Sequence, residues 1–203
     1  MSVSKYLLMS KDRRHDIIAA AIDLFARKGF RGTTTRDLAS HAEVNEALIF
    51  RHFKTKEDLY TAILEQKVGE SREAQCKEFE RLAETRDDAM LFEALGRTFM
   101  RKHEGDTTFM RLLLFSALEG HALSEMFLAS VADRDPVARY IQRRIDEGAF
   151  RPLDPHLAAR ALFGMFASFV QWQELFGQKK TKPFDSDEVV RTFVSIFLSG
   201  IKR

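Results

Sequence analysis

Hydrophobic and polar positions along the chain repeat with a helical period over most of its length. Apolar residues recur three and four positions apart in long blocks, and few segments alternate with a period of two. A chain of 203 residues is long enough to bury a sizeable core. The pattern therefore predicts an all-α protein of one or two domains.

The clearest helix start lies near residue 35. Thr34 is a good N-cap residue, and Asp37 three positions later completes a capping box. The carboxylate of Asp37 also favours the positive end of the helix dipole. These residues predict a short helix that begins at Thr35.

A second short helix is expected from about Asn45 to Phe53. Ala42 and Val44 supply the small and the apolar residue that a corner between two helices needs. The residues that recur at helical spacing, and so form the buried side, are Leu48, Ile49 and Phe53. Two short helices and a tight turn together predict a helix-turn-helix over about residues 35–53.

A helix-turn-helix presents the start of its second helix to base edges, and its first helix and flanks hold phosphates. Asn45 is the best candidate for base readout, because a carboxamide pairs bidentately with adenine. Glu46 could accept from a cytosine amino group and Ala47 could touch a thymine methyl. The other predicted DNA-binding residues are Thr33, Thr34, Thr35, Arg36, Phe50, Arg51, His52, Thr55 and Lys56. Two alternatives stay open: Asn45 as a helix cap and His52 as a packed surface histidine.

At these positions the chain resembles the TetR family of bacterial transcription repressors. The match runs from Arg13 to about Leu59, roughly the first sixty residues. Its motifs are Leu24-Phe25-Ala26-Arg27-Lys28-Gly29-Phe30, Thr33-Thr34 with Arg36-Asp37-Leu38-Ala39, Ala42-x-Val44, and Phe53-Lys54-x-Lys56-Glu57-Asp58-Leu59. The resemblance implies an all-helical plan, a homodimer, a double-stranded DNA operator and a small-molecule effector.

Three residues depart from the pattern of that family. The family usually has glycine in place of Glu43, threonine or a small residue in place of Leu48, and tyrosine in place of Phe50. Glu43 leaves the turn without its most permissive residue, and Phe50 lacks a hydroxyl that could donate to a phosphate. These departures bear on operator preference and leave the expected fold unchanged.

The chain is expected to divide into a DNA-binding domain over 1–57 and a helical ligand-binding and dimerisation body over 58–203. Residues 1–9 are expected to form a loose arm, and a connector helix is expected from Leu59 to about Glu80. Further helix signals are Asp87 as a start, Gly148 as a stop, Asp154-Pro155 as a start and Asp185 with Glu188 as the last start.

The last two predicted helices carry apolar surface that a partner could cover. One has a stripe of small residues, and the other has an apolar stripe wider than one contact within the chain requires. The predicted dimer interface residues are Ala161, Gly164, Ser168, Phe193 and Phe197. Periodicity alone leaves two alternatives: a four-helix seam between two copies, or ordinary packing within one subunit. The resemblance favours the homodimer.

The body is rich in aromatic residues, since 13 of the 18 phenylalanines follow residue 90. Such a body could enclose an apolar pocket with a few polar groups. The candidate ligand-binding residues are Phe99, Met110, Phe115, His121, Met165, Phe169 and Trp172. Ordinary core packing is the alternative for each of them.

Charge and motifs limit the other functions. Up to Tyr60 there are 11 Lys and Arg against 8 Asp and Glu, so the modest basic excess lies at the DNA-binding end of a chain with net charge +2. The single cysteine, Cys76, excludes an internal disulfide and is typical of a reducing cytoplasm. We see no metal-ligand spacing, nucleophile elbow or phosphate loop, and no targeting or membrane segment.

These observations predict a cytoplasmic, non-enzymatic regulator without a cofactor or a metal. The predicted mechanism is that of a repressor that binds a palindromic operator as a homodimer and is released by a small apolar or aromatic ligand. Two other function classes stay open. One is a constitutive DNA-binding protein without an effector, and the other is an enzyme whose site is not visible in the sequence.

Overall fold

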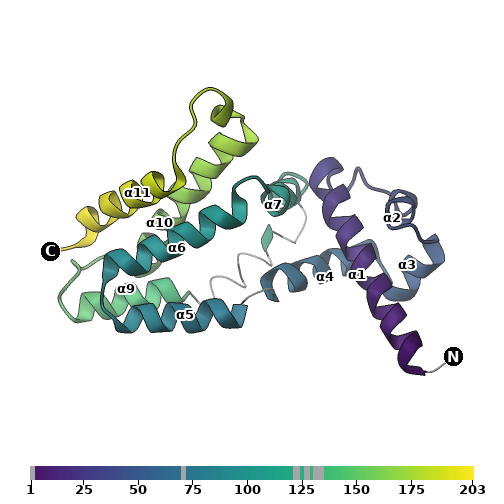
Figure 1. Ribbon diagram of the computed structural model, residues 1–203, viewed down its shortest axis with the longest axis horizontal. Helices are drawn as coiled ribbons and strands as arrows, with labels where there is room; N and C mark the ends of the chain where they lie inside the picture. Colours follow the sequence, from purple (N-terminus) through teal and green to yellow (C-terminus); the bar gives the residue numbers. More distant parts are fainter. Residues whose placement is uncertain (1–2, 70–71, 121–123, 126–128, 130–134) are drawn as a thin grey trace. The chain divides into compact units, whose positions relative to one another are not determined.

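The computed structural model describes residues 3–69, 72–120, 124–125, 129 and 135–203. Helices make up almost all of the regular structure in these segments, as Figure 1 shows, and one isolated antiparallel bridge joins Phe150 to Lys202. The helices are α1 (Val3–Lys28), α2 (Thr35–His41), α3 (Glu46–His52), α4 (Lys56–Gly69), α5 (Arg72–Glu84), α6 (Asp88–His103), α7 (Thr108–Leu118), α9 (Pro136–Asp146), α10 (Pro155–Val170), the π-helix η1 (Gln171–Leu175), the 3-10 helix η2 (Gln178–Lys180) and α11 (Ser186–Ile201). The all-α prediction is confirmed.

Capping residues fix the ends of the body helices where the sequence predicted them. The carboxylates of Asp87, Asp154 and Asp185 accept hydrogen bonds from the first backbone N–H groups of α6, α10 and α11. Gly148 follows α9 with a φ of 76°, a left-handed conformation that glycine adopts without strain. These four local signals are confirmed.

Two expectations about the ends of segments are wrong. Helix α1 begins at Val3, so residues 3–9 are helical and not a loose arm. No proline or glycine interrupts this stretch, and the helix that follows can therefore extend into it. The expected connector from Leu59 to about Glu80 contains two helices, α4 and α5, and residues 70–71 between them lie outside the described residues.

The chain forms two compact units. The first consists of residues 1–70 and 108–130, and the second of residues 71–107 and 131–203. The first unit therefore contains α1 to α4 together with α7, a helix that follows α6 in the sequence. Helices α5, α6 and α9 to α11 belong to the second unit.

An aromatic cluster lies at the centre of the first unit. The rings of Phe25 and Tyr60 meet edge to face with their centroids 4.9 Å apart, and Phe30 lies 5.0 Å from Tyr60. Tyr60 is fully buried, and its hydroxyl lies 3.5 Å from the carbonyl oxygen of Leu112 in α7. Helix α7 is thus part of the core that supports the helix-turn-helix.

Two helices of the second unit pack closely against a glycine of α6. A Cβ atom at Gly96 would lie 2.6 Å from the ring of Phe166 in α10 and 3.0 Å from Val190 in α11. Phe92, one turn earlier in α6, meets Phe197 of α11 edge to face at 5.3 Å. Helices α6, α10 and α11 therefore share one core.

Candidate functional site

The capping box predicted for α2 is present. The Thr34 hydroxyl accepts the Asp37 N–H at 3.1 Å, and the Asp37 carboxylate accepts the Thr34 N–H at 2.9 Å. The Thr34 N–H and the Thr34 hydroxyl both donate to the Asp37 carboxylate and lower its pKa, and the charge of Lys28 lowers that pKa further. The start at Thr35 is confirmed, and the Thr34 hydroxyl is engaged in the cap.

The turn after α2 has the hydrogen bonds of a Schellman motif. Val44 N–H donates to the Ala39 carbonyl at 2.9 Å, and Glu43 N–H donates to the Ser40 carbonyl at 3.4 Å. This motif needs a left-handed residue at its centre, and Glu43 supplies it with a φ of 52°. A residue with a Cβ atom is strained there, so the departure from glycine that the sequence indicated has a physical cost.

Asn45 caps α3. Its Oδ1 accepts the Leu48 N–H at 2.8 Å. The alternative role considered for Asn45 is thus present, and this oxygen is already engaged within the protein. Only the Nδ2 group of the side chain remains to donate to a nucleic acid. A bidentate pairing with adenine would need the Oδ1 as well, so the contact proposed for Asn45 is a single hydrogen bond from Nδ2.

One face of α2 and α3 is polar and exposed. Thr35 is half-buried and donates to the Glu46 carboxylate at 3.0 Å, which links the first turns of the two helices. Phe50 is 50% exposed, an unusual degree for a phenylalanine. The exposed residues predicted to bind DNA are Thr34, Arg36, Asn45, Glu46, Ala47, Phe50, Arg51 and Thr55. The structure brings them together on one helix pair and its flanks.

His52 lies at the end of α3, half-buried beside two arginines. Burial lowers the pKa of His52, and the charges of Arg51 and Arg14 lower it further. Arg14 also stacks over the ring of Phe53 at 5.2 Å. Near pH 7 His52 is therefore neutral and can offer a hydrogen bond, not a charge.

A second capping box begins α4. The Thr55 hydroxyl accepts the Asp58 N–H at 3.0 Å, and the Asp58 carboxylate accepts the Thr55 N–H at 3.0 Å. Helix α4 starts at Lys56. Thr55 is exposed beside the first N–H groups of that helix.

Thr33 and Lys56 require correction as phosphate contacts. Thr33 is 1% exposed, and its hydroxyl donates to the Gly29 carbonyl at 2.8 Å. The Lys56 ammonium donates to the carbonyls of Phe30 and Thr33 at 2.6 and 2.8 Å. Both side chains bind the loop between α1 and α2, because that loop needs partners for its backbone groups.

Sequence analysis did not identify Glu119, which follows α7 and binds the same loop. Its carboxylate accepts the N–H groups of Phe30 and Arg31. No local signal could indicate this, because the partners are 88 and 89 residues apart.

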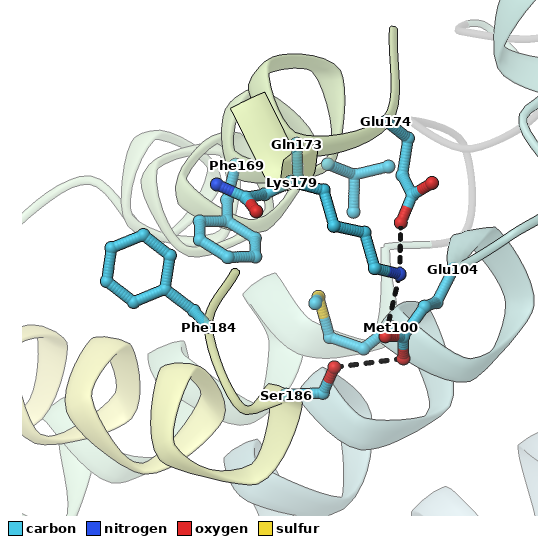
Figure 2. A pocket seen from close by; sticks show the side chains of 9 residues that line it. Met100, Glu104, Phe169, Gln173, Glu174, Lys179, Phe184 and Ser186 are labelled. Atoms are coloured by element: carbon cyan, nitrogen blue, oxygen red, sulfur yellow. Dashed lines mark hydrogen bonds and ion pairs between the residues drawn. The ribbon is translucent and has the colours of Figure 1, made fainter. Parts of the chain in front are cut away.

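A small cavity lies in the second unit among the ends of α6, α10 and α11 (Figure 2). It has a volume of about 10 Å³, an apolar floor that includes Met100 and Phe169, and a charged rim. The Lys179 ammonium lies between two carboxylates, 2.8 Å from Glu174 and 3.3 Å from Glu104. The arrangement is a partly open, salt-bridged pocket with room for about one water molecule.

The described candidate ligand-binding residues are divided between the two units. Phe169 lines the cavity, whereas Phe99 and Met165 are not among its lining residues. Met110 and Phe115 lie on α7 in the first unit. His121 lies outside the described residues.

Trp172 also requires correction. It lies on η1, 55% exposed, next to Phe176, and it does not line the cavity. Aromatic character alone does not distinguish a pocket residue from a surface residue, which is why sequence analysis misplaced it.

The small-residue stripe on α10 is exposed, as a partner surface requires. Ala161, Gly164 and Ser168 are exposed, and a Cβ atom at Gly164 would meet nothing within 4 Å. Phe197 is corrected, because it is 6% exposed and packs on Phe92 inside the unit. Phe193 is half-buried and lies between Phe166 and Phe169. Leu157 and Ile196 are exposed apolar residues on the same two helices, 65% and 59% exposed.

A metal site and a membrane-spanning helix are both absent from the described residues. In those segments no three His, Cys, Asp or Glu side chains group as metal ligands. The helices of the described ranges are all too short or too polar to cross a membrane.

Two family models match the chain. The model described as bacterial regulatory proteins, tetR family, matches residues 17–63, which include the helix-turn-helix. The model described as AefR-like transcriptional repressor, C-terminal domain, matches residues 91–200, more than half of the chain.

Curated relatives match either the N-terminal region or the whole chain. The HTH-type regulator YvkB of Bacillus subtilis is 50% identical over 50 residues, 25% of this chain and 26% of its own length. The match thus spans about a quarter of that relative. The HTH-type transcriptional repressor KstR2 of Mycolicibacterium smegmatis is 26% identical over 197 residues, 93% of this chain and 90% of its own.

Solved structures share the fold over most of the chain. The regulator FadR from Bacillus subtilis, in complex with stearoyl-CoA, aligns with a TM-score of 0.71 and 19% identity over 92% of this chain and 98% of its own. PfmR from Thermus thermophilus aligns with a TM-score of 0.63 and 26% identity over 92% and 99%.

Proposed function

The chain belongs to the TetR family of transcription regulators, and we propose that it is a repressor that binds a palindromic operator as a homodimer and is released by a small apolar effector. Its role on this proposal is regulatory and not catalytic. The observation that supports it best is the exposed polar face shared by α2 and α3.

The DNA contacts divide by chemistry. Ala47 and the Asn45 Nδ2 group, at the start of α3, face base edges, and Glu46 is held beside them by Thr35. Arg36 and Arg51 contact phosphates, which set the register of the protein on the duplex. The residues we propose as contacts are Thr34, Thr35, Arg36, Asn45, Glu46, Ala47, Phe50, Arg51, His52 and Thr55.

A second copy of the chain covers the exposed stripes of α10 and α11. Small side chains at Ala161, Gly164 and Ser168 let a partner helix approach closely, and exposed Leu157 and Ile196 supply apolar area. A two-fold dimer places two recognition helices about 34 to 36 Å apart, one turn of DNA. This spacing is why the proposed operator is palindromic.

The effector acts on the second unit, where the cavity has an apolar floor. An apolar ligand that prefers one conformation of the body shifts DNA affinity by its differential affinity for the two states, commonly about 1 to 3 kcal/mol. The stearoyl-CoA bound by FadR, a protein of this fold, supports an effector with an apolar chain, and such an effector requires a body conformation with a larger cavity than the one described above.

Selection from a randomised duplex library at fixed salt tests the DNA-binding proposal. We expect a palindromic consensus, and we expect Arg36→Ala to weaken binding to the selected duplex about tenfold. Arg151→Ala is the matched control, because Arg151 is exposed in the second unit and its replacement removes the same charge. If the protein retained duplexes that share no consensus, an architectural role would be favoured. If it retained no duplex, DNA binding would be contradicted.

A further inference from the structure

The loop over residues 29–33 carries the chain from α1 to the helix-turn-helix. Thr34, the cap of α2, follows it directly. Its backbone groups contact two charged side chains from distant parts of the first unit, Glu119 after α7 and Lys56 at the start of α4. The position of the loop therefore depends on both α7 and α4.

Glu119 binds the amide side of this loop. Its Oε2 accepts the Phe30 N–H at 2.9 Å, and its Oε1 accepts the Arg31 N–H at 3.3 Å. Successive backbone N–H groups that converge in this way form an anion-binding nest, and here the anion is a carboxylate of the same chain. Gly29 makes room for it, because a Cβ atom there would lie 2.3 Å from Oε1.

Lys56 binds the carbonyl side of the loop. Its ammonium donates to the carbonyls of Phe30 and Thr33 and lies 4.0 Å from the centroid of the Phe30 ring. Burial lowers the pKa of Lys56, and the charges of Glu57 and Glu119 partly oppose that effect. The two charges hold opposite sides of the same short segment.

A second group of α7 binds the end of α1. The Arg111 Nε donates to the Ala26 carbonyl at 2.9 Å. Arg111 and Glu119 are eight positions apart, about 12 Å along a helix. Helix α7 thus contacts backbone groups both of α1 and of the loop that leads to α2.

We propose that Glu119 is a positioning residue for DNA binding. Its carboxylate is bound by the loop, and it fixes the direction in which α2 and α3 leave α1. Recognition helices must be placed to within a fraction of an ångström to contact bases, so a loosened loop lowers affinity without the loss of any direct DNA contact. This inference rests on the proposed DNA-binding function.

The test variant is Glu119→Gln. A glutamine side chain has one acceptor oxygen where the carboxylate has two. With that oxygen in the place of Oε2, the Arg31 N–H keeps only the 3.4 Å contact, loses the acceptor at Oε1 and meets an NH₂ donor there, and both N–H groups lose the charge assistance. We expect its affinity for the duplex that the wild-type protein selects from the randomised library to fall about tenfold.

Glu65→Gln is the matched control. Glu65 is exposed on α4 in the same unit, and the replacement removes the same negative charge. A less negative protein attracts DNA slightly more, so we expect this control to bind equally or more tightly. Glu119→Gln should thus lower the DNA affinity, whereas Glu65→Gln should not, so the comparison separates the positioning role of Glu119 from the effect of net charge. Because Glu119→Gln removes no phosphate contact, the salt dependence of binding should stay unchanged.

Amide hydrogen exchange gives a readout that does not require DNA. In Glu119→Gln the amides of Phe30 and Arg31 should exchange faster than in the wild type and in Glu65→Gln, while circular dichroism shows the same helix content. Unchanged exchange at both amides would overturn the contact. Faster exchange with unchanged affinity would overturn the positioning role. A wild-type protein that retains no duplex would instead contradict the proposed function on which this role depends.

Discussion

Arg144 of α9 and Asp88 of α6 form a two-point ion pair in the core of the second unit. Arg144 Nε lies 2.9 Å from Asp88 Oδ1, and Nη2 lies 3.2 Å from Oδ2. The Asp88 side chain is only 4% exposed, and the Tyr140 hydroxyl donates to it at 2.7 Å. The hydrogen bonds from Arg144 to Asp88 raise the pKa of Arg144. Burial raises the pKa of Tyr140, and the hydrogen bond from Tyr140 to Asp88 raises it further. One buried carboxylate thus joins two helices.

Asp88→Ala should lower the free energy of unfolding by about 3 kcal/mol, because it removes the buried partner of Arg144, which keeps only Glu147, and leaves the Tyr140 hydroxyl without its acceptor. Urea denaturation measures the change. Glu78→Gln breaks the exposed pair with Arg81 and should leave the urea midpoint unchanged. Equal urea midpoints for the two variants would show that the buried ion pair contributes no more to stability than the exposed one.

Glu43→Gly should stabilise the first unit. The left-handed φ of 52° strains any residue with a Cβ atom, and glycine relieves this at some cost in chain entropy, for a net gain of about 0.5 to 1 kcal/mol. Thermal unfolding would show a higher Tm. Glu43→Ala retains the Cβ atom and should give no such gain, so an equal rise in both variants would assign the effect to the side-chain charge.

The stability of the second unit should fall on acidification. Burial, with a contribution from Lys102, lowers the pKa of His103 below the ordinary 6.5, and Asp106 opposes this. The unfolded chain then binds more protons than the folded protein as the pH drops below about 6.5, so stability is full above that pH and decreases below it. Tm measured between pH 5 and 8 should decline more steeply in the wild type than in His103→Gln. A parallel decline would show that His103 does not carry the effect.

Two substitutions at Asn45 separate its cap from its proposed DNA contact. Asn45→Ser keeps a hydroxyl acceptor for the Leu48 N–H but removes the Nδ2 donor. We expect it to unfold at the wild-type temperature while DNA affinity falls about tenfold. Asn45→Ala should lose the affinity and also about 1 kcal/mol of stability. Wild-type affinity in Asn45→Ser would leave Asn45 with a capping role alone.

Features that depend on neighbours in the sequence were predictable. The caps at Thr34, Asp154 and Asp185 join residues two or three positions apart, so their spacing alone identifies them. The helix-turn-helix follows from the same local signals. The all-α fold follows from the helical period of the apolar residues.

Features that depend on distant partners were not predictable. Nothing near Lys56 indicates that its ammonium turns inward to the carbonyl of Phe30, 26 residues earlier. The wide apolar stripe of α11 indicates that part of the helix is buried, but it does not indicate which residues face the core. Phe197 faces the core, and Ile196 faces outward. Glu119 was not predictable for the same reason, because its partners Phe30 and Arg31 are 89 and 88 residues away in the sequence.

An altered-specificity selection would best decide whether α3 of two symmetric subunits contacts bases. Ala47 is exposed in the first turn of α3, and Ala47→Asn places there a carboxamide that prefers adenine. Selection from the same randomised library should give a consensus changed at one position in each half-site, symmetrically, with the other positions kept. An identical consensus for Ala47→Asn and the wild type would contradict base contact by α3, and a change in one half only would contradict a symmetric dimer.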